Sequence, residues 1–394
     1  MRSIHPFPAR MAPEILDDLL LSCPADGVIL DPMCGSGTVV RKVIASGRRA
    51  IGLDTDPLAI LMTTVATRRP SKKAFERTLS SVLQYARRYG DRLKELSRDS
   101  ETLAFIKFWF AKDQRHELNA LTRAIEFERL KQRNSPSLNL LRLAVSRTII
   151  TKKVGASLAA DVSHSRPHKV RTKNNYAVLE NFERIARSIF SILESAELNN
   201  KAEVHLDDVR QMKTVKDATI DAIITSPPYL NALDYLRGHK LALVWLGSEI
   251  PKIRKLRSTN VGTENTSGVA QGDEAPWSEV LTVFPSLQNL SERQQKMTYK
   301  YVLDLLKMSK QFARVLKDGG TLHTVIGNSN IGNVYVPNSD LFEFCSKKFG
   351  FKIQSSKERQ IPDNKRYLPI SGSVGVLAKR MRKEVVQSFT LAKA

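Results

Sequence analysis

The sequence predicts an α/β protein in which a doubly wound, mostly parallel sheet carries an inserted helical subdomain. Three observations lead to this prediction. An apolar segment, a glycine turn, a helical segment and a second apolar segment follow one another over residues 27–56, as in a βαβ unit. Another apolar run, residues 221–224, ends directly before a Pro-Pro turn. Between them, residues 60–200 have a helical and basic pattern that is too long for one crossover.

Composition sets the outer bounds. The 394 residues, 42% of them hydrophobic, suffice for one large domain with insertions or for two domains. A net charge of +22 favours a polyanionic partner, with nucleic acid as the first expectation and a merely basic enzyme as the alternative. Cys23, Cys34 and Cys345 lack disulfide-framework or zinc-ligand spacing, so no metal is expected. The sequence has no pattern of a membrane span or an export signal, so we expect a cytoplasmic protein.

The N-terminal residues predict an extended arm followed by a helix. Prolines recur through residues 6–13, and Pro13 suits the first turn of a helix. That helix has an apolar stripe that should pack on the sheet, formed by Ile15, Leu16, Leu19 and Leu20. His5 lies in the proline-rich arm, where we expect a surface or hydrogen-bonding role and not a catalytic one.

The first βαβ unit has the features of a nucleoside site. The turn from Asp31 to Thr38 contains Gly35 and Gly37, which allow a ligand to approach the backbone. Asp54 ends the next strand and can accept hydrogen bonds from both hydroxyls of a ribose. The third glycine of a dinucleotide fingerprint would fall at Val40, so a nucleoside cofactor without a pyrophosphate fits better.

The helical stretch contains two segments of interest. The aromatic run 105–110 is expected to be helix core and not a base-stacking surface. The loop 163–173 is densely basic, and its cations suit contact with phosphate, although a solvated charge run is the alternative. Its candidate DNA-binding residues are Arg166, Lys169, Arg171 and Lys173.

The sheet resumes over residues 202–209, where Asp208, or nearly as well Asp207, could accept a hydrogen bond from an adenine amine. After the strand 221–224 comes the loop 225–229, Thr-Ser-Pro-Pro-Tyr. Two successive prolines fix φ and remove two backbone donors, which holds the preceding carbonyls rigid between a hydroxyl and an aromatic face. We interpret this loop as a socket for a flat, amine-bearing ring, with a plain Pro-Pro turn as the alternative.

The last third of the chain completes the sheet. A helix over residues 233–247 should end on a glycine cap. Residues 251–292 are expected to form a mobile loop able to contact a polyanion, or equally a disordered connector; their basic residues are Lys252, Arg254, Lys255 and Arg257. Helices near 299–316 and 339–348 flank a strand at 321–327. The apolar runs 351–361 and 373–379 predict a terminal hairpin with one antiparallel strand, followed by a tail at 381–394.

Two motifs carry a family resemblance. The segment 31–38 together with 225–229 resembles the S-adenosylmethionine-dependent DNA amino-methyltransferases. The Ser-Pro-Pro-Tyr form of the loop is similar to the cytosine-N4 branch, whereas adenine-N6 enzymes more often have Asp-Pro-Pro-Tyr. The arm 7–13 also resembles the segment that precedes the cofactor strand in that family. The resemblance covers roughly 1–60 and 200–380, and the helical insert departs from it.

The resemblance implies a seven-stranded Rossmann-like sheet, with the arm and cofactor unit at 1–60, a helical basic insertion that could recognise DNA at 61–200 and a catalytic half at 201–380. It implies S-adenosyl-L-methionine as the cofactor and double-stranded DNA as the substrate, with a cognate restriction endonuclease as a candidate partner and a monomer as the working form. The implied cofactor-binding residues are Phe7, Asp31, Pro32, Cys34, Gly35, Gly37, Thr38, Asp54, Asp208 and Thr225. The implied catalytic residues are Ser226, Pro227, Pro228 and Tyr229.

The expected reaction is direct methyl transfer to a base amine, with the base flipped out of the duplex and stacked on Tyr229. Cytosine-C5 chemistry would need a cysteine nucleophile, but Cys34 lies within the cofactor turn, where a packed thiol is the simpler interpretation. The alternatives are adenine-N6 methylation, an RNA guanine-N2 or protein-amide methyltransferase, and a nucleic-acid-binding scaffold that has lost activity.

Overall fold

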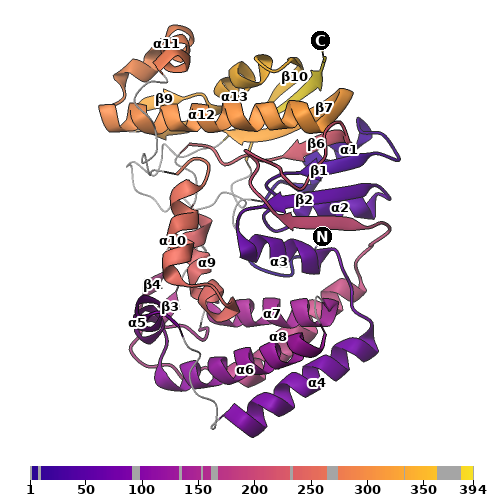
Figure 1. Ribbon diagram of the computed structural model, residues 1–394, viewed down its shortest axis with the longest axis vertical. Coiled ribbons are helices and arrows are strands. Elements are labelled where there is room, and N and C mark those ends of the chain that lie inside the picture. The colour runs from indigo at the N-terminus through magenta and orange to yellow at the C-terminus, as the bar shows by residue number, and fades with distance from the viewer. Residues whose placement is uncertain are drawn as a thin grey trace.

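The computed structural model describes residues 2–7, 10–90, 98–132, 135–151, 154–160, 167–230, 234–263, 274–331, 333–361 and 383–393. A sheet flanked by helices forms one part of the molecule, and a layer of helices forms the other (Figure 1). Helices α9 (Tyr235–Leu243) and α10 (Ile250–Thr259) lie along one side of the molecule, between these two parts.

The sheet has the order β10-β11-β7-β6-β1-β2-β5. Its strands in chain order are β1 (Val28–Asp31), β2 (Arg49–Asp54), β5 (Ala202–Leu206), β6 (Ile220–Thr225), β7 (Leu316–Gly327), β10 (Phe351–Gln360) and β11 (Lys383–Leu391). All neighbouring strands are parallel except β11, which is antiparallel to both β7 and β10. The predicted seven-stranded, mostly parallel sheet with one antiparallel strand near its end is therefore confirmed.

Helices cover both faces of the sheet because successive strand residues point to opposite sides. Ile29 packs with α1 (Pro13–Leu21) and α2 (Thr38–Ala45) on one face. Leu30 packs on the other face with α12 (Glu292–Val315) and α13 (Asn338–Lys347). The sheet is thus doubly wound, and its strand order reverses between β1 and β6, which is where such sheets bind ligands.

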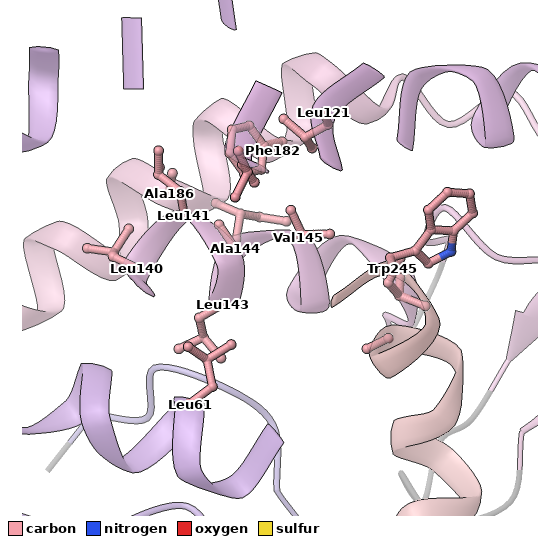
Figure 2. Packing of buried hydrophobic residues seen from close by; sticks show 14 of the residues in the cluster. Leu61, Leu121, Leu140, Leu141, Leu143, Ala144, Val145, Phe182, Ala186 and Trp245 are labelled. Atoms are coloured by element: carbon pink, nitrogen blue, oxygen red, sulfur yellow. The ribbon is translucent and has the colours of Figure 1, made fainter. Parts of the chain in front are cut away.

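The insert is helical, as predicted. It contains α4 (Lys72–Tyr89), α5 (Ser100–Trp109), α6 (Lys112–Lys131), α7 (Pro136–Ile149) and α8 (Val178–Glu194), with a short antiparallel pair of β3 (Ala159–Ala160) and β4 (His168–Lys169). These helices share one core with α3 (Pro57–Ala66) and with the turn η2 (Val244–Leu246) after α9. In Figure 2, Leu61 of α3 meets Leu143 of α7. The insert is therefore packed onto the cofactor half.

Two expectations about the last third of the chain are wrong. The loop expected at 251–292 contains α10, α11 (Glu274–Val283) and the 3-10 turn η3 (Pro285–Asn289). Helix α10 begins with Pro251 in its first turn and buries only Ile253, so its polar composition is that of an exposed helix. The expected tail at 381–394 contains β11, in which Gln387, Phe389 and Leu391 alternate into the core. The strand expected at 373–379 lies outside the described residues.

Other features agree with the sequence. Pro13 stands in the first turn of α1, and Gly247 has a left-handed φ of 100° after η2, as expected of a glycine cap. A terminal hairpin of β10 and β11 is present, but its second strand is 383–391, within the segment expected to be a tail. Within the part of the chain that the structure describes, no helix has the length and apolarity needed to cross a membrane.

Candidate active site

The candidate site lies where the carboxyl ends of β1, β2 and β6 meet. Asp31 ends β1, Asp54 ends β2 and Thr225 ends β6. The Thr225 hydroxyl donates a hydrogen bond of 3.0 Å to Asp31 Oδ1, and the Gly35 amide donates one of 2.9 Å to Asp54 Oδ2. Hydrogen bonds therefore join three strand ends and the glycine turn, which brings together the expected cofactor and catalytic segments.

The glycines of the turn permit close packing. Gly35 and Gly37 have left-handed φ angles of 49° and 76°. A Cβ atom at Gly35 would lie 2.9 Å from Cζ of Phe7, and one at Gly37 would lie 2.8 Å from Oγ1 of Thr63. The Phe7 ring of the arm thus lies directly on the turn, and the close approach that the sequence assigned to a ligand is made at Gly35 by the chain itself.

Two carboxyl groups, that of the buried Asp31 and that of the half-buried Asp54, dominate the electrostatics of the site. Burial, with a smaller contribution from the nearby Asp54 carboxylate, raises the pKa of Asp31 to about 7, although hydrogen bonds from Met33 and Thr225 oppose this rise. Burial and the neighbouring Asp56 charge raise the pKa of Asp54 to about 6. Such a pair favours a ligand that brings positive charge and hydrogen-bond donors.

Cys34 is unsuited to nucleophilic chemistry. Its side chain is buried, and the Thr63 hydroxyl donates to its Sγ at 3.3 Å. Burial raises the pKa of this thiol well above its ordinary value, and the charges of Asp54 and Asp31 raise it further. Since the thiolate is the reactive form, the buried thiol is inert. This supports the interpretation of Cys34 as a packing residue of the cofactor turn.

A network that the sequence did not reveal fixes α9 to the cofactor turn. Asp56 follows β2; its Oδ1 caps α3 by accepting from the Leu58 amide at 2.8 Å, and its Oδ2 lies 2.5 Å from Nδ1 of His239 on α9. The Phe7 ring stacks on Tyr235 of the same helix at 4.9 Å and lies 5.9 Å from the His239 ring. The sequence indicates Asp56-Pro57 as a helix start, but no local signal identifies a partner 183 positions away.

The proline loop presents one exposed hydroxyl. The Ser226 side chain is exposed, and its hydroxyl donates to the carbonyl of Val325 on β7 at 2.8 Å. Because its hydrogen is engaged, the Ser226 oxygen is left as an acceptor. Pro227 is buried, whereas Pro228 and Tyr229 are half-buried. The structure thus gives this loop the hydroxyl and the aromatic side chain that a socket for an amine-bearing ring requires.

Neighbouring segments hold the loop from two sides. Gly262 follows α10 with a φ of 73°, and a Cβ atom there would lie 3.0 Å from the Tyr229 carbonyl. The Ser329 hydroxyl donates to the Leu230 carbonyl at 2.7 Å, and Ser329 in turn accepts from the buried Asn338 amide at 2.8 Å. The end of α10 and the segment after β7 therefore both constrain the proline loop.

The acidic residues after β5 already have partners. Asp208 accepts from Arg210 at 2.9 Å and 2.6 Å; burial opposes its ionisation, but this guanidinium lowers the pKa of the carboxyl overall. Asp207 accepts from the amide and hydroxyl of Thr214 at 2.8 Å and 2.7 Å. An adenine amine at Asp208 would have to share the carboxylate with Arg210.

One residue of each set of candidate DNA-binding residues contacts α5. Lys169 on β4 places its Nζ 4.3 Å from the centre of the Phe108 ring of α5. On α10, Arg254 pairs with Glu101 of α5. Of the other residues in the first set, Arg171 and Lys173 line an open groove. In the second set, Lys252 pairs with Glu249, Arg257 pairs with Asp234, and Lys255 is exposed. Arg166 lies outside the described residues. Lys169 and Arg254 therefore bring two segments that are far apart in the sequence to the same helix, α5.

The strand order, the glycine turn and the proline loop together are similar to those of the methyltransferase class of α/β proteins. No protein-family profile matches the chain. It is 23% identical over 393 residues to the type II methyltransferase M.MvaI of Kocuria varians, covering 92% of this chain and 84% of that protein. It is 24% identical over 298 residues to the type II methyltransferase M.BsoBI of Geobacillus stearothermophilus, covering 67% of this chain and 56% of that one. The family resemblance seen in the motifs is therefore confirmed.

Solved structures with weak similarity include two methyltransferases. An S-adenosylmethionine-dependent methyltransferase from Methanosarcina mazei gives a TM-score of 0.36 at 10% identity, over 98% of this chain and all of that one. A TehB-like S-adenosylmethionine-dependent methyltransferase from Corynebacterium glutamicum gives a TM-score of 0.31 at 9% identity, over 96% of this chain and 85% of that one. Within the described ranges, no group of three or more His, Cys, Asp or Glu side chains could hold a metal ion.

Proposed function

We propose that this protein is an S-adenosylmethionine-dependent DNA methyltransferase that methylates the exocyclic N4 amine of cytosine in duplex DNA, by base flipping and direct in-line transfer. The observation that carries the proposal is the Ser226 hydroxyl, which is exposed, donates to Val325 and so keeps its lone pairs for an amine. It directly follows Thr225, the last residue of β6, whose hydroxyl donates to the buried Asp31. Two relatives named as type II methyltransferases add support.

The site residues fit the cofactor by their chemistry. S-adenosyl-L-methionine supplies a methyl group activated by a positively charged sulfur. Asp54 accepts hydrogen bonds from the ribose hydroxyls of the cofactor, and the buried Asp31 carboxylate faces the positive charge of the cofactor. Both carboxyls have raised pKa values, so each needs a partner of this kind to be ionised. The remaining proposed cofactor residues are Phe7, Pro32, Cys34, Gly35, Gly37, Thr38, Asp208 and Thr225.

The proline loop orients the amine. The lone pair of an exocyclic amine is delocalised into the ring, which makes the nitrogen a poor nucleophile. The Ser226 oxygen and the Pro227 carbonyl accept the two amine hydrogens and draw the nitrogen toward tetrahedral geometry. Pro228 fixes the direction of that carbonyl. Positioning of this kind can lower a barrier by about 7–11 kcal/mol. The Tyr229 ring stacks on the flipped base.

The basic residues contact DNA phosphates. Arg166, Lys169, Arg171, Lys173, Lys252, Arg254, Lys255 and Arg257 form this proposed set, and the net charge of +22 supports a polyanionic substrate. We place DNA recognition in the helical insertion at 61–200. We further propose that the enzyme acts as a cytoplasmic monomer beside a cognate restriction endonuclease.

The experiment that tests the substrate base is nucleoside analysis. Purified protein is incubated with S-adenosyl-L-methionine and unmethylated duplex DNA, the DNA is digested, and methylated nucleosides are identified by mass spectrometry. We expect N4-methylcytosine. N6-methyladenine would retain the loop mechanism and replace cytosine by adenine, whereas absence of any methylated deoxynucleoside would contradict DNA methylation.

A further inference from the structure

Helix α5 exposes aromatic side chains that would ordinarily be buried. Only Thr102 and Ile106 of this helix are buried, while the Phe108 side chain is 53% exposed. Phe105 and Trp109 are half-buried, and the Trp109 ring lies 5.1 Å from Phe108 in an edge-on arrangement. The expectation that this run belongs to the helix core holds for the buried Phe110 and is wrong for Phe108.

Cations from two other elements lie over these rings. Lys169 of β4 approaches Phe108 to 4.3 Å, and Lys240 of α9 approaches Phe105 to 5.4 Å. Both distances, from Nζ to the ring centre, are within the range of a cation–π interaction. The α5 surface, defined as Phe105, Phe108, Trp109, Lys169 and Lys240, therefore combines apolar ring faces with positive charge.

The charge around the α5 surface is positive. Burial lowers the pKa of Lys240, and the charges of Arg257 and Arg237 lower it further, although Asp234 opposes them. The facing acidic groups are engaged in ion pairs, Glu101 with Arg254 and Asp234 with Arg257. Each of these acidic groups is neutralised by its partner, so the charges of Lys169, Lys240 and Arg237 make the surface positive. Charge complementarity thus favours an anionic partner, and the rings favour one with flat, stackable groups.

Contacts connect the α5 surface to the catalytic loop. The Thr102 hydroxyl of α5 accepts from the Ile250 amide at the start of α10, at 2.9 Å. At its other end α10 leads to Gly262, which packs on Tyr229. The ten residues of α10 span about 15 Å along the helix axis, which equals the rise of about four base pairs of DNA. Figure 1 shows α5, β4 and α10 together along one side of the molecule.

We propose that the α5 surface binds the DNA strand beside the flipped base, with Phe108 stacking on an unstacked nucleotide and Lys169 and Lys240 on the adjoining phosphates. Base flipping interrupts the stack and leaves nucleotides whose faces are open. Aromatic side chains alternating with cations are the features with which proteins hold single-stranded nucleic acid. The inference rests on the proposed function, because it needs DNA as the substrate.

The chain offers a matched control. Phe127 of α6 is 41% exposed and has Lys131 4.0 Å from its ring centre, so it repeats the arrangement of Phe108 and Lys169. Its ring stacks on Tyr85 of α4, at the end of the molecule away from the sheet (Figure 1). Substitution there removes the same groups at a place where the inference expects no DNA.

The test compares DNA affinity of Phe108→Ala and Phe127→Ala, using duplex DNA and an oligothymidylate single strand as probes. Loss of one stacking contact should weaken binding about 5- to 150-fold in Phe108→Ala, with no change in Phe127→Ala. Lys169→Ala should lower the slope of log affinity against log salt by about one, while Lys131→Ala leaves it unchanged. Affinity for S-adenosyl-L-methionine should stay at the wild-type value in all four variants and so reports intact folding.

Suppose that the wild-type protein binds and methylates DNA. Equal DNA affinities of Phe108→Ala and Phe127→Ala, together with equal salt slopes of the two lysine variants, would then overturn this inference and leave the proposed function standing. A wild-type protein that neither binds nor methylates DNA would overturn the proposed function, and the inference with it.

Discussion

The affinity for S-adenosyl-L-methionine should depend on pH through the carboxyls of Asp31 and Asp54. The pKa of Asp31 is raised to about 7 and that of Asp54 to about 6, so the ligand-free protein holds protons there that an ordinary aspartate would have lost. A ligand with positive charge and donor hydroxyls binds the ionised forms. Binding therefore releases protons, and affinity should rise with pH.

The size of the effect follows from the two pKa values. A carboxyl with a pKa of about 7 is roughly ten parts protonated to one part ionised at pH 6 and almost fully ionised at pH 8, so Asp31 alone should weaken binding about tenfold at pH 6. Asp54 contributes about a further twofold. The free energy of unfolding of the ligand-free protein should change with pH in the opposite direction. Because both folded pKa values are raised, the stability that these groups give the ligand-free protein is full below about pH 4 and declines as pH rises through 6 and 7.

The assay is isothermal titration calorimetry at pH 6, 7 and 8, in two buffers with different ionisation heats. We expect about twentyfold weaker binding at pH 6 than at pH 8, with at least about one proton released at pH 6 and almost none at pH 8. Asp31→Asn should leave only the twofold dependence of Asp54. Equal affinity of the wild-type protein at pH 6 and pH 8 would refute the assignment of these carboxyls to the cofactor.

Further predictions concern the catalytic loop and its support. Ser226→Ala should lower the rate of DNA methylation about 100-fold or more with unchanged cofactor affinity, because the reacting amine loses an oriented hydrogen-bond acceptor. Single-turnover kinetics measures this rate, and a value within threefold of wild type would contradict the prediction. Tyr229→Ala should raise the KM for DNA about 5- to 150-fold through lost stacking, and an equal loss of cofactor affinity in titration would refute that role. His239→Ala should lower the free energy of unfolding by about 1–3 kcal/mol, since Oδ2 of the buried Asp56 loses its hydrogen-bond partner. The exposed pair of His205 with Glu203, 3.6 Å apart, provides the control: His205→Ala should cost less than about 1 kcal/mol in urea unfolding, and equal effects of the two variants would disprove the reasoning.

The cofactor half of the site was accessible to sequence reasoning because its signals are local. The turn with Gly35 and Gly37 stands between an apolar strand and a helix, and Asp54 ends the following strand. In a parallel sheet the carboxyl ends of neighbouring strands meet at one edge, and this rule places the proline loop beside that turn. The hydrogen bond between Thr225 and Asp31 agrees with that expectation.

Features that depend on tertiary packing could not be predicted from the sequence. The pairing of Asp56 with His239 joins positions far apart in the chain. Helix α10 is rich in Lys and Arg and fully buries only Ile253. Its short apolar stripe, completed by Ile250 and Leu256, which pack on the core, was hidden by that basic composition. The exposure of Phe108 depends on how α5 lies against α10 and β4, and an aromatic run alone predicts burial.

The most direct test of the central claim is to follow an isotopically labelled methyl group from S-adenosyl-L-methionine into duplex DNA, RNA and protein, for the wild-type chain and Ser226→Ala in parallel. The account predicts label in duplex DNA, lost in Ser226→Ala although that variant binds the cofactor as tightly as wild type. Label in RNA or protein alone, or equal labelling of DNA by both chains, would contradict it.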